Sequence, residues 1–394
     1  MPHVRTATAA TLLTIAMAAG TAVTAAAAAA ATPPPFDPTD PESLRQARAF
    51  QQRVLDARPT VVAPALESDT TIDFGRGPVP VHVPASYDPA TPTPLIILLH
   101  GYTSSGPAVE AWMQLAPLVD EYGFLYVSPT GTSDSFGLPF WNATDACCDL
   151  TGGNPDDSGY LRTIVDVMST EYTVDPRRIH FAGHSNGGFM SYRMACDHAD
   201  VVASVASFAG ATFLDASDCT PSEPVHTLQI HGTLDDVIDY GGGCIPFGGC
   251  YPGAVQTTET WAAYGGCSPV GETLPEWLDL VANIPGDDTT VTRYDTDCDA
   301  GGSAELWTIN GGPHSPTLSA DFSRLMVEFL LAHPKPSACP ADVNGSGAVD
   351  FDDLVAVLAA WGPCDECPAD VDGDGAVGLD DVLQVLSGWG ACDG

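Results

Sequence analysis

Basic residues are scarce in this sequence. The 394-residue chain has 13 Lys and Arg against 51 Asp and Glu, and its one lysine is Lys335. A surface that follows phosphate groups needs clustered basic side chains, so the composition argues against binding to nucleic acid or anionic membrane. Residues 336–394 contain 12 Asp or Glu and no Lys or Arg. This imbalance predicts a C-terminal segment that binds cations.

Long apolar runs are also missing beyond the first thirty residues. No later segment reaches the roughly 18–20 continuous apolar residues that a membrane span requires. At the N-terminus, His3 and Arg5 precede an apolar stretch over residues 7–23 and an alanine run to Ala31. This order is typical of a secretory signal peptide over residues 1–31, with cleavage between Ala25 and Thr32. A membrane anchor is the alternative, but the apolar core is short and alanine-rich. We therefore expect a secreted, extracellular protein without a membrane span after cleavage.

Cysteine is frequent for a chain of this size. Eight of the 12 cysteines lie between residues 147 and 298, and four lie between residues 339 and 392. In an exported protein such cysteines form disulfides, and we expect the pairs Cys244–Cys250 and Cys267–Cys298. A zinc site is the alternative, but the adjacent cysteines at 147 and 148 lack a partner pair at ligand spacing.

Short apolar segments alternate with helical patterns from residue 70 onward. We expect strands at 71–74, 79–84, 95–99, 125–128, 179–182, 202–208, 227–230 and 304–309, and helices at 108–121, 159–172 and 319–332. This alternation predicts an α/β fold with a mostly parallel sheet covered on both faces. We divide the chain into the signal peptide, an N-terminal lead and helix (32–65), an α/β domain (66–335) and a C-terminal module (338–394).

A nucleophile motif lies between a predicted strand and a predicted helix. The sequence Gly183-His-Ser185-Asn-Gly187 has the G-x-S-x-G form. A serine in such a strand-to-helix turn adopts a strained backbone that exposes its oxygen, and the flanking glycines leave room for the turn. Ser185 is therefore the predicted nucleophile, and a purely structural glycine-rich turn is the alternative. We expect His184 to pack rather than to catalyse.

The base and its orienting acid should follow the nucleophile in the order serine, acid, histidine. His314 lies in a loop after the strand that ends near residue 309, and a surface-loop histidine is the alternative role. Asp235 follows the strand at 227–230 and would orient the imidazole. The backbone N–H groups of Asn186 and Tyr102 are the predicted oxyanion hole.

These segments resemble a known family. Leu95-Ile-Ile-Leu-Leu-His-Gly101, the Ser185 motif, His231-Gly-Thr-Leu-Asp235 and Gly311-Gly-Pro-His314 are similar to motifs of polyhydroxybutyrate depolymerases and feruloyl esterases, the carbohydrate esterase family 1-like group. The resemblance covers residues 70–333. It implies the α/β-hydrolase fold and ester hydrolysis through an acyl-enzyme, without a cofactor for catalysis.

Three functions stay open from the sequence. The first is release of feruloyl or acetyl groups from plant polysaccharide such as xylan, and the second is hydrolysis of a hydroxyalkanoate polyester. The third, from another class, is a binding or scaffold protein whose hydrolase domain is degenerate. The intact order of nucleophile, acid and base argues against the third.

The C-terminal module is a duplicated unit. Five residues of the first copy recur 28 positions later: Cys339, Asp342, Asp353, Trp361 and Cys364 return as Cys367, Asp370, Asp381, Trp389 and Cys392. Each copy contains a loop that is similar to an EF-hand, with oxygen ligands at positions 1, 3, 5, 7 and 12. The predicted Ca²⁺ ligands are Asp342, Asn344, Ser346, Ala348 and Asp353 in the first loop, and Asp370, Asp372, Asp374, Ala376 and Asp381 in the second.

Aspartate at position 12 makes the module similar to dockerins, which dock to partner proteins. Dockerins often contact cohesins through small hydroxyl residues at positions 10 and 11. Phe351-Asp352 and Leu379-Asp380 stand there instead, which argues against cohesin as the docking partner. We expect helices at 352–361 and 380–389, and disulfides that close each copy on itself, Cys339–Cys364 and Cys367–Cys392.

Overall fold

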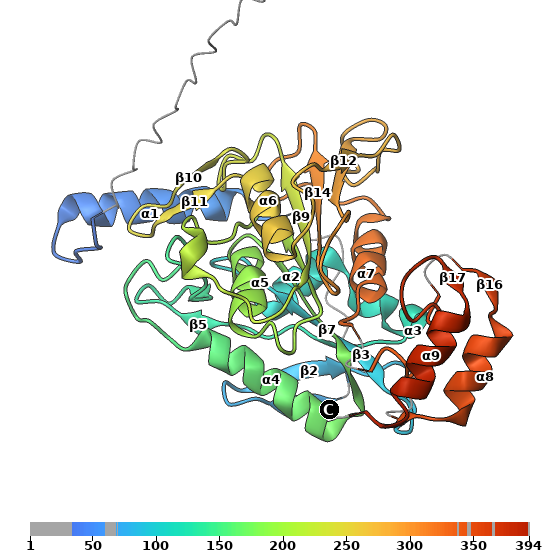
Figure 1. Cartoon of the computed structure of the whole chain (residues 1–394). Helices are drawn as coiled ribbons and strands as arrows, with labels where there is room; N and C mark the ends of the chain where they lie inside the picture. The colour runs from blue at the N-terminus through green and yellow to red at the C-terminus, as the bar shows by residue number, and fades with distance from the viewer. Residues whose placement is uncertain are drawn as a thin grey trace, which may run out of the picture. The chain divides into compact units, whose positions relative to one another are not determined.

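A ten-stranded sheet forms the centre of the α/β domain (Figure 1). The computed structural model describes residues 34–59, 68, 70–336, 339–344, 348–364 and 367–392, so the expected signal peptide lies outside the described residues. From edge to edge the strands are β1 (Thr71–Asp73), β2 (Pro78–His82), β4 (Leu125–Val127), β3 (Thr93–Leu99), β7 (Val174–His184), β8 (Ser204–Phe208), β9 (His226–Gly232), β14 (Ser303–Ile309), β13 (Thr289–Tyr294) and β12 (Glu272–Thr273). The six central strands, from β4 to β14 in this order, run parallel to one another. At one edge β2 pairs antiparallel with both β4 and β1, and at the other β13 pairs antiparallel with both β14 and β12.

Helices cover both faces of this sheet. Every residue of β3 is buried, because its side chains point alternately into two apolar layers. One layer is made with α1 (Pro41–Asp56), α4 (Asp157–Glu171), α5 (Asn186–Asp197) and α6 (Ala254–Tyr264). The other is made with α2 (Gly106–Met113), α3 (Val119–Tyr122) and α7 (Phe322–Ala332). The expected parallel α/β arrangement is therefore confirmed.

The predicted helix over residues 108–121 is wrong as a single element. α2 ends at Gln114, whose φ of 55° is left-handed, and a short 3-10 turn (Ala116–Leu118) separates it from α3. The buried carboxylate of Glu110 accepts the N–H groups of Leu115 and Ala116 at this break. It also accepts the hydroxyl of Tyr126, at 2.5 Å. The break therefore keeps its backbone donors satisfied by a side chain.

Helix α1 lies within the expected N-terminal lead and helix (32–65), and its start is capped. The side chain of Asp40 accepts N–H groups of the first turn, and Pro41 occupies the first helical position. The inner face of α1 is buried, with Phe50 and Val54 in the same apolar cluster as strand residues of the sheet. The N-terminal helix is thus packed against the α/β domain.

Both disulfides predicted within the α/β domain are present. Cys244–Cys250 joins the short strands β10 (Gly242–Cys244) and β11 (Cys250–Pro252), and Cys267–Cys298 is the second pair. Two further pairs are Cys147–Cys148 and Cys196–Cys219. A hairpin of β5 (Thr132–Ser133) and β6 (Pro139–Phe140) precedes the first of these.

The disulfides predicted within the C-terminal module are wrong. The pairs are Cys339–Cys392 and Cys364–Cys367. The module has two helices, α8 (Phe351–Ala359) and α9 (Leu379–Ser387), and each loop pairs with the segment that follows the other helix. β15 (Ala348–Val349) pairs with β18 (Gly390–Ala391), and β16 (Gly362–Pro363) pairs with β17 (Ala376–Val377). This exchange brings the first and last cysteines of the module together, so the copies are joined to each other.

Among the described residues, no helix is long and apolar enough to cross a membrane.

Buried neutral histidines should make the domain sensitive to acid. His180 on β7 is fully buried and bonds through Nδ1 to the hydroxyl of Ser204, 2.8 Å away. Burial lowers the pKa of His180 from 6.5 to about 3. Below pH 6.5 the imidazole therefore binds a proton in the unfolded chain but stays neutral in the folded chain. The contribution of His180 to the free energy of unfolding is fully present above pH 6.5 and falls as the pH drops toward 3.

We predict that His180→Asn reduces the pH dependence of the unfolding free energy between pH 5.5 and 4.5 by about 1.4 kcal/mol per pH unit. Urea denaturation of the wild type and the variant at a series of pH values measures this slope. Equal slopes for the two proteins would contradict the proposed burial of a neutral imidazole.

Candidate active site

Ser185 occupies the turn between β7 and α5. Its φ of 55° and ψ of −119° lie outside the regions that side chains ordinarily adopt. The turn is possible because glycines flank it. A Cβ at Gly183 would lie 2.2 Å from the carbonyl oxygen of Gly187, and one at Gly187 would lie 2.1 Å from that of Leu99. The sequence motif therefore forms the strained turn expected of a nucleophile.

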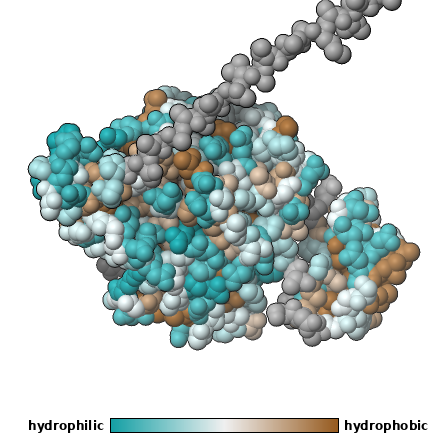
Figure 2. Space-filling model, turned by 60° about the vertical axis from the view of Figure 1, so that its left-hand side comes forward, coloured by the Kyte–Doolittle hydropathy of each residue, from teal (hydrophilic) through white to brown (hydrophobic). Residues whose placement is uncertain are grey.

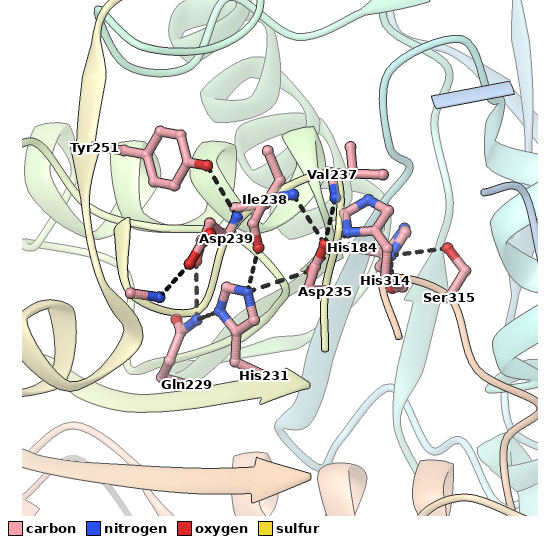
Figure 3. A network of polar contacts seen from close by, with 12 residues as sticks. His184, Gln229, His231, Asp235, Val237, Ile238, Asp239, Tyr251, His314 and Ser315 are labelled. Carbon is pink, nitrogen blue, oxygen red and sulfur yellow. Dashed lines mark hydrogen bonds and ion pairs between the residues drawn. The ribbon is translucent and has the colours of Figure 1, made fainter. Parts of the chain in front are cut away.

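His314 and Asp235 meet across the ends of two neighbouring strands (Figure 3). Asp235 follows β9 and His314 follows β14, and His314 Nδ1 lies 2.7 Å from Asp235 Oδ2. The other carboxylate oxygen accepts the backbone N–H groups of Val237 and Ile238, at 2.9 and 2.8 Å. Burial alone would raise the pKa of Asp235, but the charge of His314 and hydrogen bonds from neighbouring histidines outweigh it and lower the pKa. Asp235 is thus an ionised acceptor that fixes the orientation of the imidazole.

A second histidine, His231, supports the same carboxylate. Its Nε2 lies 3.3 Å from Asp235 Oδ2 and 2.8 Å from the carbonyl oxygen of Ile238, while its Nδ1 lies 3.0 Å from Gln229 Nε2. Because Nε2 faces two acceptors and Nδ1 faces an amide donor, the neutral form with a proton on Nε2 satisfies every contact. This supporting role of His231 was not predicted from the sequence. Its position at the end of β9, four residues before the acid, was the available signal.

His184 supports the loop that carries His314. Its Nε2 lies 2.9 Å from the carbonyl oxygen of His314, and its ring packs edge-on against Trp112 with centroids 4.7 Å apart. Burial lowers the pKa of His184 to about 3, so the ring is neutral at physiological pH and its N–H donates to that carbonyl. The expected packing role fits this geometry.

Ser185 and His314 line one pocket of 30 Å³ together with Tyr102. Ser185 is 4% exposed and His314 is 2% exposed. In the part of the chain that the structure describes, His314 Nε2 is buried and has no hydrogen-bond partner. Since Nδ1 faces Asp235, Nε2 is the nitrogen available to accept a proton.

The two expected oxyanion donors border the same turn. Nothing among the described residues accepts the backbone N–H of Tyr102 or of Asn186. The Asn186 side chain is held by two bonds to the backbone of Trp141, with its Oδ1 accepting at 2.7 Å and its Nδ2 donating at 2.8 Å. The Tyr102 hydroxyl donates to Asp134 at 2.6 Å and accepts from Gln51 at 3.0 Å. Both residues are fixed by their side chains, which leaves their backbone donors in place for a ligand.

Helix α1 and the residues after it contribute contacts that the sequence did not predict. Phe50 stacks on the ring of Tyr102 with centroids 6.4 Å apart, and Gln51 bonds to its hydroxyl. The guanidinium of Arg58 donates to the carbonyl oxygen of Thr103. No local pattern signals these contacts, because an amphipathic helix does not specify the surface against which it packs.

The glycine at position 187 gives a direct test of the turn. We predict that Gly187→Ala lowers the free energy of unfolding by roughly 2–3 kcal/mol, since the new methyl group would overlap backbone oxygens that cannot move independently of β3. Urea denaturation measures the change. Gly153→Ala is the matched control, because its Cβ would meet nothing closer than 3.7 Å. The same unfolding midpoint for both variants would show that the turn is not tightly packed.

Known proteins share these features. Residues 83–244 match the family model described as phospholipase/carboxylesterase. The chain is 30% identical over 242 residues to feruloyl esterase B of Piromyces equi, which covers 60% of this chain and 42% of that protein. It is 30% identical over 160 residues to a bifunctional acetylxylan esterase/xylanase of Neocallimastix patriciarum, covering 41% of this chain and 22% of that protein. It is 29% identical over 294 residues to poly(3-hydroxyalkanoate) depolymerase C of Paucimonas lemoignei, covering 72% of this chain and 65% of that protein.

The matched region spans less than two thirds of each of these relatives. They nevertheless confirm the resemblance to feruloyl esterases and hydroxyalkanoate depolymerases that the motifs indicated. The parallel sheet and the strained serine turn have the arrangement of an α/β-hydrolase fold, and they agree with the similarity to the phospholipase/carboxylesterase family over residues 83–244.

Proposed function

We propose that this chain is a serine carboxylic ester hydrolase in which Ser185, Asp235 and His314 form the catalytic triad. The observation that carries the proposal is the 2.7 Å hydrogen bond between His314 Nδ1 and Asp235 Oδ2. His314 also lines the same pocket as Ser185, whose φ is positive. A buried carboxylate, an oriented imidazole and a serine in a strained strand-to-helix turn are the three parts that acyl transfer through serine requires.

In the proposed reaction, His314 Nε2 takes the proton of the Ser185 hydroxyl as the oxygen attacks the ester carbonyl. The backbone N–H groups of Asn186 and Tyr102 donate to the oxyanion that forms. The bond to the alcohol breaks, and His314 gives its proton to the leaving oxygen. Water then attacks the acyl-enzyme with His314 again as the base, which releases the acid and restores Ser185. Asp235 stays ionised and stabilises the imidazolium, and the chemistry needs no cofactor.

For the substrate we propose feruloyl or acetyl esters on plant polysaccharide such as xylan. Two of the relatives are named for such esters, and the dockerin-like tail is typical of polysaccharide-degrading proteins. A hydroxyalkanoate polyester is the second candidate, favoured by the depolymerase relative. Hydrolysis of such a polymer outside the cell would agree with the proposed signal peptide and secretion.

We predict that Ser185→Ala lowers kcat on 4-nitrophenyl acetate by at least about a thousandfold, because no other group supplies the nucleophile. Asp235→Asn should lower kcat by roughly ten-thousandfold through loss of the imidazole orientation. Ser217→Ala, which changes a serine in an exposed turn, is the matched control and should keep wild-type activity. A fluorophosphonate probe should label the wild type and not Ser185→Ala. Equal labelling of both, or activity in neither protein, would favour the degenerate scaffold.

We also propose that the C-terminal module binds Ca²⁺ through its two loops. In the second loop, ligand oxygens of Asp370, Asp372 and Asp374 lie within 4.8 Å of one another. Gly373 and Gly375 have φ of 72° and 87°, which allows the chain to wrap around a small centre. An all-oxygen set of this spacing suits a hard cation such as Ca²⁺.

The aspartates at position 12, Asp353 and Asp381, accept hydrogen bonds from backbone N–H groups of their own loops. Asp381 accepts the N–H groups of Val371 and Gly378, at 2.7 and 2.6 Å, and so joins the two ends of its loop. Asp353 accepts those of Asn344 and Asp350, at 3.0 and 2.8 Å. The carboxylates of Asp353 and Asp381 are therefore bonded to backbone rather than grouped with the other ligands. Ser346 lies outside the described residues.

Calcium binding can be measured on the full chain. We predict two bound Ca²⁺ per chain by isothermal titration calorimetry, and one for the double variant Asp372→Asn/Asp374→Asn, since that loop loses two charged ligands. Asp380→Asn is the matched control, because Asp380 is exposed and stands at position 11. Unchanged stoichiometry in the double variant would contradict the assignment of the second loop.

For the docking partner we propose a protein with an apolar strip bordered by Lys and Arg. The module exposes a repeated set of large apolar side chains on α8, α9 and the segments after them, and Figure 2 shows apolar colour gathered along one edge of the module. The set is Phe351, Val355, Leu358 and Trp361 with Leu379, Leu383, Leu386 and Trp389. Because residues 336–394 contain no basic residue, a second copy would bring acidic borders together.

A further inference from the structure

Two pockets of different size and chemistry meet at His314. The pocket of 30 Å³ contains Ser185 and is walled by the apolar side chains of Val54 from α1 and of Val109 and Trp112 from α2. The second pocket has a volume of 610 Å³ and shares Ala57, Arg58, His314 and Ser315 with the first. Helix α1 contributes to both, because Val54 faces the smaller pocket and its neighbour Arg53 lines the larger one.

The chemistry of the proposed reaction assigns each pocket a part of the substrate. The acyl carbon must lie against Ser185 and Tyr102, which border only the smaller pocket. The alcohol oxygen must receive its proton from His314, so the alcohol extends toward the larger pocket. The larger pocket is lined by Gln52, Arg53, Asp56 and Asp236, and these groups suit a hydroxyl-rich alcohol rather than a hydrocarbon chain.

The size of the smaller pocket limits the acyl group. About 10–15 Å³ of such space holds one water molecule, so 30 Å³ leaves room for a group of two or three heavy atoms. An acetyl group is of that size. A feruloyl group, with its aromatic ring and propenoyl chain, is much larger. Val54, Val109 and Trp112 in the wall of the smaller pocket are buried, and interiors are packed closely enough that such side chains do not make room for a feruloyl group on their side of the pocket.

The wall from α1 is fixed by its contacts. Val54 is 7% exposed and belongs to the core cluster, and one turn earlier Phe50 and Gln51 contact Tyr102. After the helix, Arg58 bonds to the backbone of Thr103 in the same loop. Helix α1, which forms one wall of the smaller pocket, is therefore attached to the loop that contains Tyr102, a proposed oxyanion donor.

From these observations we infer that helix α1 selects the substrate, and that the substrate class is acetyl esters of polar, polysaccharide-like alcohols. This inference rests on the proposed esterase function and narrows it. Val54 sets the length of the acyl group. In the reaction, the Ser185 oxygen forms a bond to the acetyl carbon, the bond to the sugar oxygen breaks, and the proton passes through His314 to that sugar oxygen.

The test compares 4-nitrophenyl acetate, butyrate and octanoate together with methyl ferulate. For the wild type we expect kcat/KM to fall at least about tenfold from acetate to butyrate, and further for octanoate and ferulate. Val54→Ala should raise the ratio of butyrate to acetate roughly tenfold by removing two methyl groups from the wall. Acetylated xylan should be deacetylated in a Ser185-dependent manner.

Val79→Ala is the matched control. Val79 on β2 is also 7% exposed and lies in the same core cluster, but it lines neither pocket, so its truncation should leave the ratio unchanged. Equal use of acetate and ferulate by the wild type, or equal ratios in the Val54 and Val79 variants, would overturn the inference and leave the esterase function intact. Failure to hydrolyse any of these esters in a Ser185-dependent manner would overturn both.

Discussion

The positive φ of Ser185 is the constraint on which the rest of the α/β domain depends. A side chain in this backbone region costs on the order of 1–3 kcal/mol, and the surrounding contacts must offset it. The N–H of Ser185 donates to the carbonyl oxygen of Phe208 on β8, at 2.7 Å, and its own carbonyl accepts the N–H of Phe189 on α5, at 3.0 Å. The turn is thus held by the neighbouring strand on one side and the following helix on the other. The first of these bonds requires parallel β7 and β8 in register, and the buried core of the sheet holds them so.

Features coded by neighbouring residues were predicted well from the sequence. The strand before Ser185 and the glycines at 183 and 187 form one local signal, and the structure gives the strained turn that this signal predicted. Asp235 and His314 were found from chain order alone, and they meet because β9 and β14 are adjacent and parallel. Their catalytic role and the two oxyanion donors stay predictions. The expectation for β3 succeeded for a similar reason, since an unbroken apolar run suits a strand that is covered on both faces.

What the sequence did not predict arises from contacts between distant segments. The pairing of Cys339 with Cys392 follows from the way in which the two copies exchange short strands, and each copy read by itself favoured an internal disulfide. The support that His231 gives to Asp235 depends on a turn that folds back over the end of β9. A helix was expected within residues 32–65, yet the packing of α1 against the loop of Tyr102 had no sequence signal. Periodicity identifies the buried face of a helix and leaves its partner unspecified.

In the proposed reaction, the position of α1 separates the groups that do the chemistry from those that select the substrate. The strained turn of Ser185 lies at the end of β7, and Asp235 and His314 lie in the loops after β9 and β14. Val54 and Arg53 are adjacent in sequence but line two different pockets, so in the proposed substrate arrangement a single helix bounds the acyl group on one side and the alcohol on the other. Under that proposal, substitutions in α1 would alter either part of the substrate without replacing Ser185, Asp235 or His314. Arg53 is exposed and can change at little cost in stability, whereas Val54 is buried in the core, so its truncation also loses packing.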